Sequence, residues 1–206
     1  VDIVYGKSSA PKDSIHDKTV TATLRALADN PDSSILVFLP GQGEIRRVED
    51  SLAIELMSRK ISGVHLRTLY GNLSLDAQQA AIAPVPNLGE RKIVLATNIA
   101  ETSLTIEGVD VVIDSGLARE PVFDPTSGMT RLHTRKVSQA SSTQRMGRAG
   151  RLRPGKCYRL WSKSQQDQMA PHATPEILNA DLTPVALQLL QWGINDPADL
   201  AWLDPP

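Results

Sequence analysis

The segment from Gln144 to Arg151 combines side chains that suit the recognition of a phosphate group. Its sequence, QRMGRAGR, places three arginines and two glycines in eight residues without an acidic side chain. Guanidinium groups match phosphate oxygens bidentately, so this composition favours an anion bound outside the segment. In a helix, Gln144, Arg148 and Arg151 fall at positions i, i+4 and i+7 and share one face. The spacing therefore predicts a cationic surface directed at an anion.

A second interpretation of this segment involves no ligand. Gly150 could end a helix, and arginines in the last turn favour the negative end of the helix dipole. Against this, like charges on one face repel by roughly 0.2–0.5 kcal/mol per pair, and a glycine inside a helix costs about 1 kcal/mol relative to alanine. These costs favour the anion, but the segment alone leaves both interpretations open.

The basic residues of the chain are concentrated around this segment. No Asp or Glu lies between Asp124 and Asp167, whereas ten Lys and Arg do. The remaining sequence holds 12 basic and 23 acidic residues, which brings the net charge to −1. Such segregation is typical of a protein with a basic face for a polyanion. The alternative is that acidic residues from elsewhere in the fold pair with these arginines.

Length and composition indicate a folded globular chain. Its 206 residues, 41% of them hydrophobic, are sufficient for one substantial core. No apolar run approaches the roughly 18–20 residues of a membrane helix, and the first residues do not resemble a secretory signal. Cys157 is the only cysteine, which excludes an internal disulfide and a Cys-rich metal site. We therefore expect a soluble, cytoplasmic protein with no membrane partner and no metal ligands of its own.

Apolar periodicity along the chain predicts an α/β fold. Short apolar runs predict strands at 34–39, 64–70, 92–96, 109–113 and 156–161. Helical periodicity predicts helices at 44–59, 74–84, 138–150 and 182–192. This alternation indicates a parallel sheet covered by helices on both faces. Segments 121–125 and 129–133 flank Thr126-Ser127-Gly128 and predict an antiparallel β-hairpin.

The loop that follows the strand at 92–96 is rich in hydroxyl and amide groups. Its sequence from Thr97 to Ile106 is TNIAETSLTI. Ligands of open α/β sheets gather at the carboxyl ends of strands, where hydroxyls suit phosphate and sugar oxygens, although turns and helix caps use the same residues. No G-x-x-x-x-G-K-[ST] phosphate loop occurs in the chain. The sequence thus contains half of a nucleotide site.

Taken together, these segments resemble the second RecA-like lobe of a superfamily 2 helicase of the DEAH-box family, most of all the bacterial HrpB-type enzymes. SSILVFLPGQGEI is similar to motif IV, ATNIAETSLTIEGV to motif V and QRMGRAGR to motif VI. The resemblance implies a RecA-like core lobe at residues 1–162. It also implies that residues 163–206 are a linker and the start of a helical or winged-helix domain, so that the lobe has a short helical C-terminal extension.

The resemblance implies catalytic roles in motifs V and VI. Gln144, Arg148 and Arg151 would face the γ-phosphate of ATP, with the two arginines acting as arginine fingers that stabilise charge on the transferred phosphoryl group. Ser103 and Thr105 would lie near the metal, the attacking water or the nucleotide.

Two further residues are implied to hold the nucleoside. Glu107 would contact the ribose, at a position where many relatives carry aspartate. Ile82 would contact the base, where many relatives carry a phenylalanine that stacks on it. Isoleucine has no aromatic face, so low base selectivity is expected.

The remaining implied contacts are with RNA. Gly71, Thr97 and Arg119 fall where relatives touch the RNA backbone, and residues 118–134 fall where they carry a strand-separating hairpin. Contacts to the backbone carry little sequence information, so sequence preference should be weak.

The function implied by the resemblance is that of the C-terminal motor lobe of an ATP-dependent RNA helicase moving 3′-to-5′ on single-stranded RNA. ATP with Mg²⁺ would be bound mainly by the N-terminal RecA-like lobe of the same protein, so this chain alone should be inactive. Two alternatives remain: a DNA-directed helicase lobe of the same superfamily, and a non-catalytic RNA-binding or adaptor module.

Overall fold

The computed structural model of the chain describes residues 1–7, 14–102, 106–151 and 153–206. The chain divides into two compact units. Unit 1 comprises Val1–Ala118 and Lys136–His172, and unit 2 comprises Arg119–Arg135 and Ala173–Pro206. Motifs IV, V and VI all belong to unit 1.

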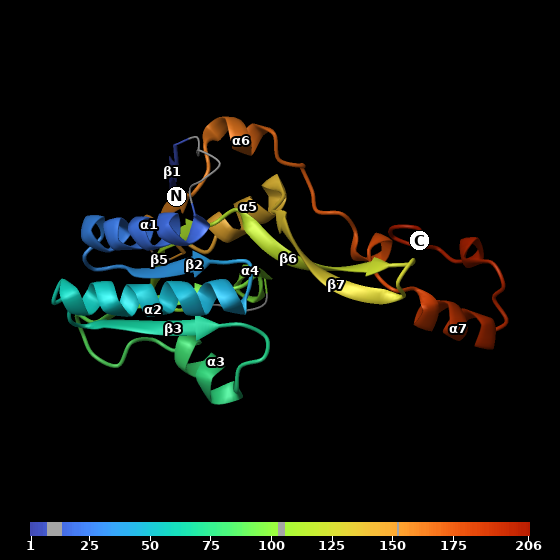
Figure 1. Cartoon of the computed structure of the whole chain (residues 1–206), viewed down its shortest axis with the longest axis horizontal. Coiled ribbons are helices and arrows are strands. Elements are labelled where there is room, and N and C mark those ends of the chain that lie inside the picture. The colour runs from blue at the N-terminus through green and yellow to red at the C-terminus, as the bar shows by residue number, and fades with distance from the viewer. Residues whose placement is uncertain (8–13, 103–105, 152) are drawn as a thin grey trace. The chain divides into compact units, whose positions relative to one another are not determined.

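A six-stranded parallel sheet forms the centre of unit 1 (Figure 1). Its strands are β1 (Asp2–Tyr5), β2 (Ser34–Phe38), β3 (Val64–Leu69), β4 (Arg91–Ala96), β5 (Val109–Asp114) and β8 (Lys156–Arg159), in the order β1-β8-β5-β2-β4-β3. All five strand pairings are parallel. The predicted parallel sheet is confirmed, with β1 as a strand that the apolar pattern did not indicate. Every residue of the central strand β2 is buried, which explains its continuous apolar run.

Helices cover both faces of the sheet, as predicted. The helices α1 (Ile15–Asp29) and α2 (Gln42–Ser58) pack on the face that carries Ile93 and Leu95 of β4, and lie side by side in Figure 1. The other face carries α3 (Leu75–Ile82), α4 (Ile99–Thr102) and α5 (Gln139–Met146) against Val94 and Ala96. A further short helix, α6 (Lys163–Asp167), follows β8. No helix among the described residues is long and apolar enough to span a membrane.

The helix α1 was not predicted from the sequence, although its first residue is clearly marked. Ser14 caps it by accepting a hydrogen bond from the backbone N–H of His16 at 3.2 Å. Two of its core positions are threonines, Thr19 and Thr23, and both are fully buried. Each hydroxyl donates to a carbonyl four residues earlier at 2.7 Å, so burial leaves it satisfied. A search for apolar periodicity misses this helix because threonines occupy part of its buried face.

The helix α5 is shorter than predicted. It begins after the cap Ser138, as expected, but ends at Met146 rather than near Gly150. Beyond it the backbone tightens, because the N–H of Arg148 bonds to the carbonyl of residue 145. Gly150 then takes a left-handed conformation with φ of 71° and packs against the backbone of Gly155. The expectation that Arg148 and Arg151 extend one helical face is therefore wrong.

Unit 2 contains the hairpin and the C-terminal segment. The hairpin strands are β6 (Leu117–Asp124) and β7 (Met129–Lys136), and their short connection requires them to be antiparallel, as predicted. The C-terminal segment forms α7 (Thr183–Gln191), which matches the predicted helix, and two 3₁₀ turns at Glu176–Leu178 and Pro197–Asp199. The N–H of Phe123 bonds to the carbonyl of Asn179 at 2.8 Å and joins the two parts. The domain boundary expected after residue 162 stays a prediction.

Candidate nucleotide site

Motif VI is anchored by Arg145, whose side chain is fully buried. Its Nε donates to Oε2 of Glu101 at 3.0 Å, and its Nη1 donates to Oδ1 of Asp114 at 2.9 Å. The same Nη1 donates to the carbonyl of Leu117 at 3.1 Å, and the guanidinium lies over the ring of Phe38 at 4.9 Å. One side chain thus joins α5 to α4, to β5 and to the centre of the sheet.

The charges around Arg145 compensate each other. Burial by itself lowers the pKa of the guanidinium, but Asp114 and Glu101 outweigh burial and raise it. Arg145 was not among the predicted site residues. Its neighbour Gln144 lies about 100° away around the helix, on the exposed side. Arg145 and Arg153, which pairs with Asp110 at 2.7 Å, confirm that acidic residues elsewhere neutralise part of the basic region.

The predicted finger residues lie at the end of this anchored helix. Gln144 is exposed in the last turn of α5, whereas Arg148 is half-buried in the following turn and Arg151 is exposed in a bend. The Nε of Arg148 donates to the carbonyl of Glu101 at 2.8 Å, and its Nη2 donates to the same oxygen. Burial and the charge of Arg151 lower the pKa of Arg148, and Glu101 opposes them. Two cationic side chains are therefore held close to each other beside the end of α4.

The two predicted nucleoside residues are in direct backbone contact. Ile82 is the last residue of α3 and is half-buried, and Glu107 is exposed just before β5. The N–H of Glu107 donates to the carbonyl of Ile82 at 3.4 Å.

The predicted RNA-binding residues fall into two places. Thr97 follows β4, and its N–H donates to the carbonyl of Leu69, the last residue of β3, at 3.1 Å. Gly71 is exposed two residues beyond Leu69, and a Cβ at this glycine would meet nothing within 4 Å. Arg119 belongs to unit 2, where its Nε donates to Oγ1 of Thr134 at 3.4 Å.

Motif V connects the predicted groups within unit 1. Thr97 at its start bonds to the end of β3, the carbonyl and side chain of Glu101 bond to motif VI, and Glu107 near its end bonds to α3. The predicted residues Ser103 and Thr105 lie outside the described part of the chain. The described contacts of motif V are therefore those of Thr97 after β4, of Glu101 in α4 and of Glu107 before β5.

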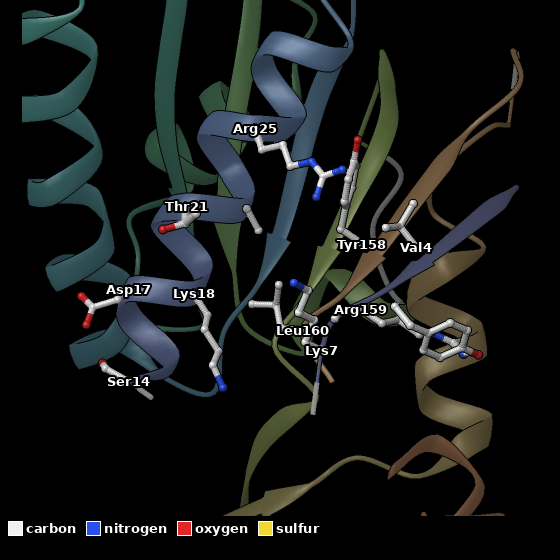
Figure 2. Close-up of a pocket in the computed structure, with 13 residues that line it drawn as sticks. Val4, Lys7, Ser14, Asp17, Lys18, Thr21, Arg25, Tyr158, Arg159 and Leu160 are labelled. Carbon is white, nitrogen blue, oxygen red and sulfur yellow. Dashed lines mark hydrogen bonds between the residues drawn. The ribbon is translucent and has the colours of Figure 1, made fainter. Parts of the chain in front are cut away.

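A cavity of about 480 Å³ lies elsewhere in unit 1, between β1, β8 and α1 (Figure 2). Its lining includes four basic residues, Lys7, Lys18, Arg25 and Arg159, together with Asp17. It contains none of the residues predicted to bind nucleotide, so it is distinct from the candidate site. Within the described ranges, no three His, Cys, Asp or Glu side chains gather as a metal-binding cluster.

Comparison with known families identifies the arrangement of motifs. The model of the helicase conserved C-terminal domain matches residues 18–153, which include motifs IV, V and VI. The chain belongs to this helicase C-terminal domain family. The match thus extends well beyond the three short motifs.

Curated relatives place this helicase C-terminal domain more closely. It is 52% identical over 190 residues to the ATP-dependent RNA helicase HrpB of Escherichia coli strain K12, covering 92% of the chain and 23% of that protein. It is 38% identical over 209 residues to the pre-mRNA-splicing factor ATP-dependent RNA helicase prp22 of Schizosaccharomyces pombe, covering 100% of the chain and 18% of that protein. The chain spans a quarter or less of the length of these relatives.

Solved structures share the fold. A crystal structure of the E. coli DExH-box NTPase HrpB superposes with a TM-score of 0.89 at 50% identity, covering 100% of the chain and 25% of that protein. A crystal structure of the E. coli DEAH/RHA helicase HrpB gives 0.90 at the same identity and coverage. The RecA-like fold expected from the sequence is confirmed, as is the similarity to HrpB-type helicases.

Proposed function

We propose that this chain is the C-terminal motor lobe of a full-length ATP-dependent RNA helicase. ATP is the substrate, bound with Mg²⁺ mainly by the N-terminal lobe of the same protein and contacted by this lobe across a cleft. One observation carries the proposal: Arg148 of motif VI lies against the carbonyl of Glu101 in motif V. Motif VI is thus held in place by the segment predicted to contact the nucleotide.

Within this proposal, the finger residues act on the γ-phosphate. Arg148 and Arg151 stabilise the charge that develops on the phosphoryl oxygens, and Gln144 faces the same phosphate. Ser103 and Thr105 act near the metal and the attacking water. Ile82 contacts the base and Glu107 the ribose. Hydrolysis removes the ligand of the fingers, and the two lobes then separate.

The proposal assigns RNA translocation to a second set of contacts. Gly71, Thr97 and Arg119 touch the backbone of single-stranded RNA, so that each cycle of closing and opening moves the lobe along one strand in the 3′-to-5′ direction. Both relatives are named as RNA helicases, which favours RNA over DNA. The presence of Gln144, Arg148 and Arg151 favours an enzyme over an adaptor, because a binding module has no use for γ-phosphate contacts.

We expect single-stranded RNA to stimulate the ATPase activity of the full-length protein several-fold more than single-stranded DNA of the same sequence. RNAs of different sequence should stimulate it alike, because the contacts go to the backbone. Steady-state ATP hydrolysis with matched oligonucleotides measures this. Equal stimulation by DNA would favour the DNA-directed alternative, and no hydrolysis with either would favour the adaptor.

We also expect the 206-residue chain by itself to hydrolyse no ATP, because it has no phosphate loop. A phosphate-release assay on the purified chain, with the full-length enzyme as positive control, measures this. Sustained ATP hydrolysis by the chain alone would contradict the proposal that it carries only half of the nucleotide site.

A further inference from the structure

Lys92 is a buried lysine of strand β4 whose ammonium group lies at the C-terminal end of helix α3. It is the second residue of β4 and only 2% exposed. Its Nζ donates to the carbonyls of Ala81 and Ile82 at 3.0 Å and to that of Ala83 at 2.5 Å. These carbonyls at the end of α3 have no partner within the helix. An ammonium has three donors, so Lys92 satisfies all three carbonyls at once.

One of these carbonyls has a second partner that matters for the nucleotide site. The oxygen of Ile82 also accepts the N–H of Glu107. The charge of Glu107 in turn favours the ammonium form of Lys92. Lys92, Ile82 and Glu107 thus meet at one oxygen atom, with Lys92 on the buried side.

We propose that Lys92 is a positioning residue for the base and ribose end of the nucleotide site. This inference rests on the proposed function, in which Ile82 contacts the base and Glu107 the ribose. Lys92 itself lies beneath the surface and touches no nucleotide. It fixes the end of α3 and, through the carbonyl of Ile82, the start of the segment that leads into β5.

Exact placement matters more for Ile82 than for an aromatic residue at the same position. An isoleucine side chain holds the base through dispersion alone, and a gap of about 0.5–1 Å forfeits a quarter to a half of that attraction. A phenylalanine would add the preferred stacking geometry of two π-systems. A rigid support below Ile82 offsets this weaker contact.

The charge on Lys92 is sensitive to pH. Burial is the main cause that lowers its pKa to about 8; the charge of Glu107 opposes burial, and that of Arg67 of β3 adds to it. The ammonium form is therefore present below pH 8 and is lost as pH rises through 8. A neutral amine has two donors for three carbonyls. The support of Ile82 should weaken in the same pH range.

The test is steady-state ATP hydrolysis by the full-length enzyme carrying Lys92→Met. Methionine retains the length and removes the ammonium. We expect KM for ATP to rise about tenfold, with kcat changed less than threefold, because the fingers are untouched. In the wild type, KM should rise between pH 7 and pH 9, and in Lys92→Met it should stay constant over that range.

The adjacent residue offers a matched control. Arg91 also caps a helix, because its Nη1 donates to the carbonyls of Leu27 and Asn30 at the end of α1, at 2.9 and 3.1 Å. It does so on the opposite face of the sheet, away from the candidate site. Arg91→Met should destabilise the fold in a similar way and leave KM within twofold of the wild type.

Several outcomes would overturn the proposal. Equal increases of KM in Arg91→Met and Lys92→Met would show that Lys92 acts only through the general stability of the fold. An unchanged KM in Lys92→Met would show that Lys92 does not position the nucleotide site. If Lys92→Met does not fold, a wild-type KM that stays constant from pH 7 to pH 9 overturns the proposal. A wild-type enzyme without ATPase activity contradicts the proposed function, and this inference with it. A Lys92→Met enzyme with normal kcat and unchanged KM for ATP contradicts this inference alone.

Discussion

Replacing Arg148 or Arg151 with alanine in the full-length helicase should reduce kcat for ATP hydrolysis by about 10³-fold or more, the range known for arginine fingers. The expected loss is large because a guanidinium contributes only when charge develops on the phosphoryl oxygens. Affinity for single-stranded RNA should stay within about twofold, because the predicted RNA contacts lie elsewhere. Single-turnover hydrolysis and fluorescence anisotropy with labelled RNA measure the two effects separately.

Arg153 is the matched control for these variants. It lies two residues beyond Arg151, its side chain is 58% exposed, and it pairs with Asp110. Arg153 is not among the residues predicted to contact the nucleotide or RNA, so Arg153→Ala should retain near-normal turnover. Wild-type hydrolysis in either Arg148→Ala or Arg151→Ala would remove that residue from the finger assignment.

The position of Arg148 in this structure is compatible with such a role. Its Nε and Nη2 donate to a neutral carbonyl, that of Glu101. A phosphate carries negative charge and several acceptor oxygens, so a guanidinium can bind it bidentately, which a single neutral carbonyl oxygen does not allow. Exchange of the carbonyl for a γ-phosphate is therefore favourable once the other lobe presents one, and the same bond keeps the side chain ordered until then.

The sequence predicted five of the six strands of the parallel sheet and missed the edge strand β1. Buried central strands such as β2 are continuous apolar runs, and a short run bounded by turn residues has few other structures available. The edge strand β1 has no residue classed as buried, and its pairing with β8 is decided by tertiary contact. The helix α1 was missed because Thr19 and Thr23 occupy its core face.

The candidate site was predicted from residue types and only partly from geometry. Gln144, Arg148 and Arg151 were predicted from the motif. They were expected on one helical face, but the helix ends at Met146. Arg145 was missed because a charged residue in a polar segment resembles a surface residue. Its partner Glu101 lies 44 positions earlier in the chain. No local pattern carries that information.

Replacing Arg145 with methionine should destabilise the lobe by about 3–5 kcal/mol, because it leaves buried carboxylates without their partner. Asp114 is fully buried and Glu101 is largely buried, so neither gains much water in compensation. A typical domain has only about 5–15 kcal/mol of stability, so this loss is a large fraction of the total. Denaturant unfolding of the chain followed by circular dichroism measures it, and ATPase activity of the full-length variant should fall with it.

Two further variants isolate the ion pair as the cause. Arg153→Met removes an arginine from Asp110, a buried carboxylate that is also on β5, but Arg153 itself is 58% exposed, so its loss should cost less than that of the fully buried Arg145. Asp114→Asn retains the side-chain oxygen that accepts the N–H of Gly116 at 2.9 Å and removes the charge. Added to Arg145→Met, it should recover part of the lost stability, because one of the two unpaired charges is gone. If the double variant were no more stable than Arg145→Met, lost packing against Phe38 rather than the buried charge would explain the effect.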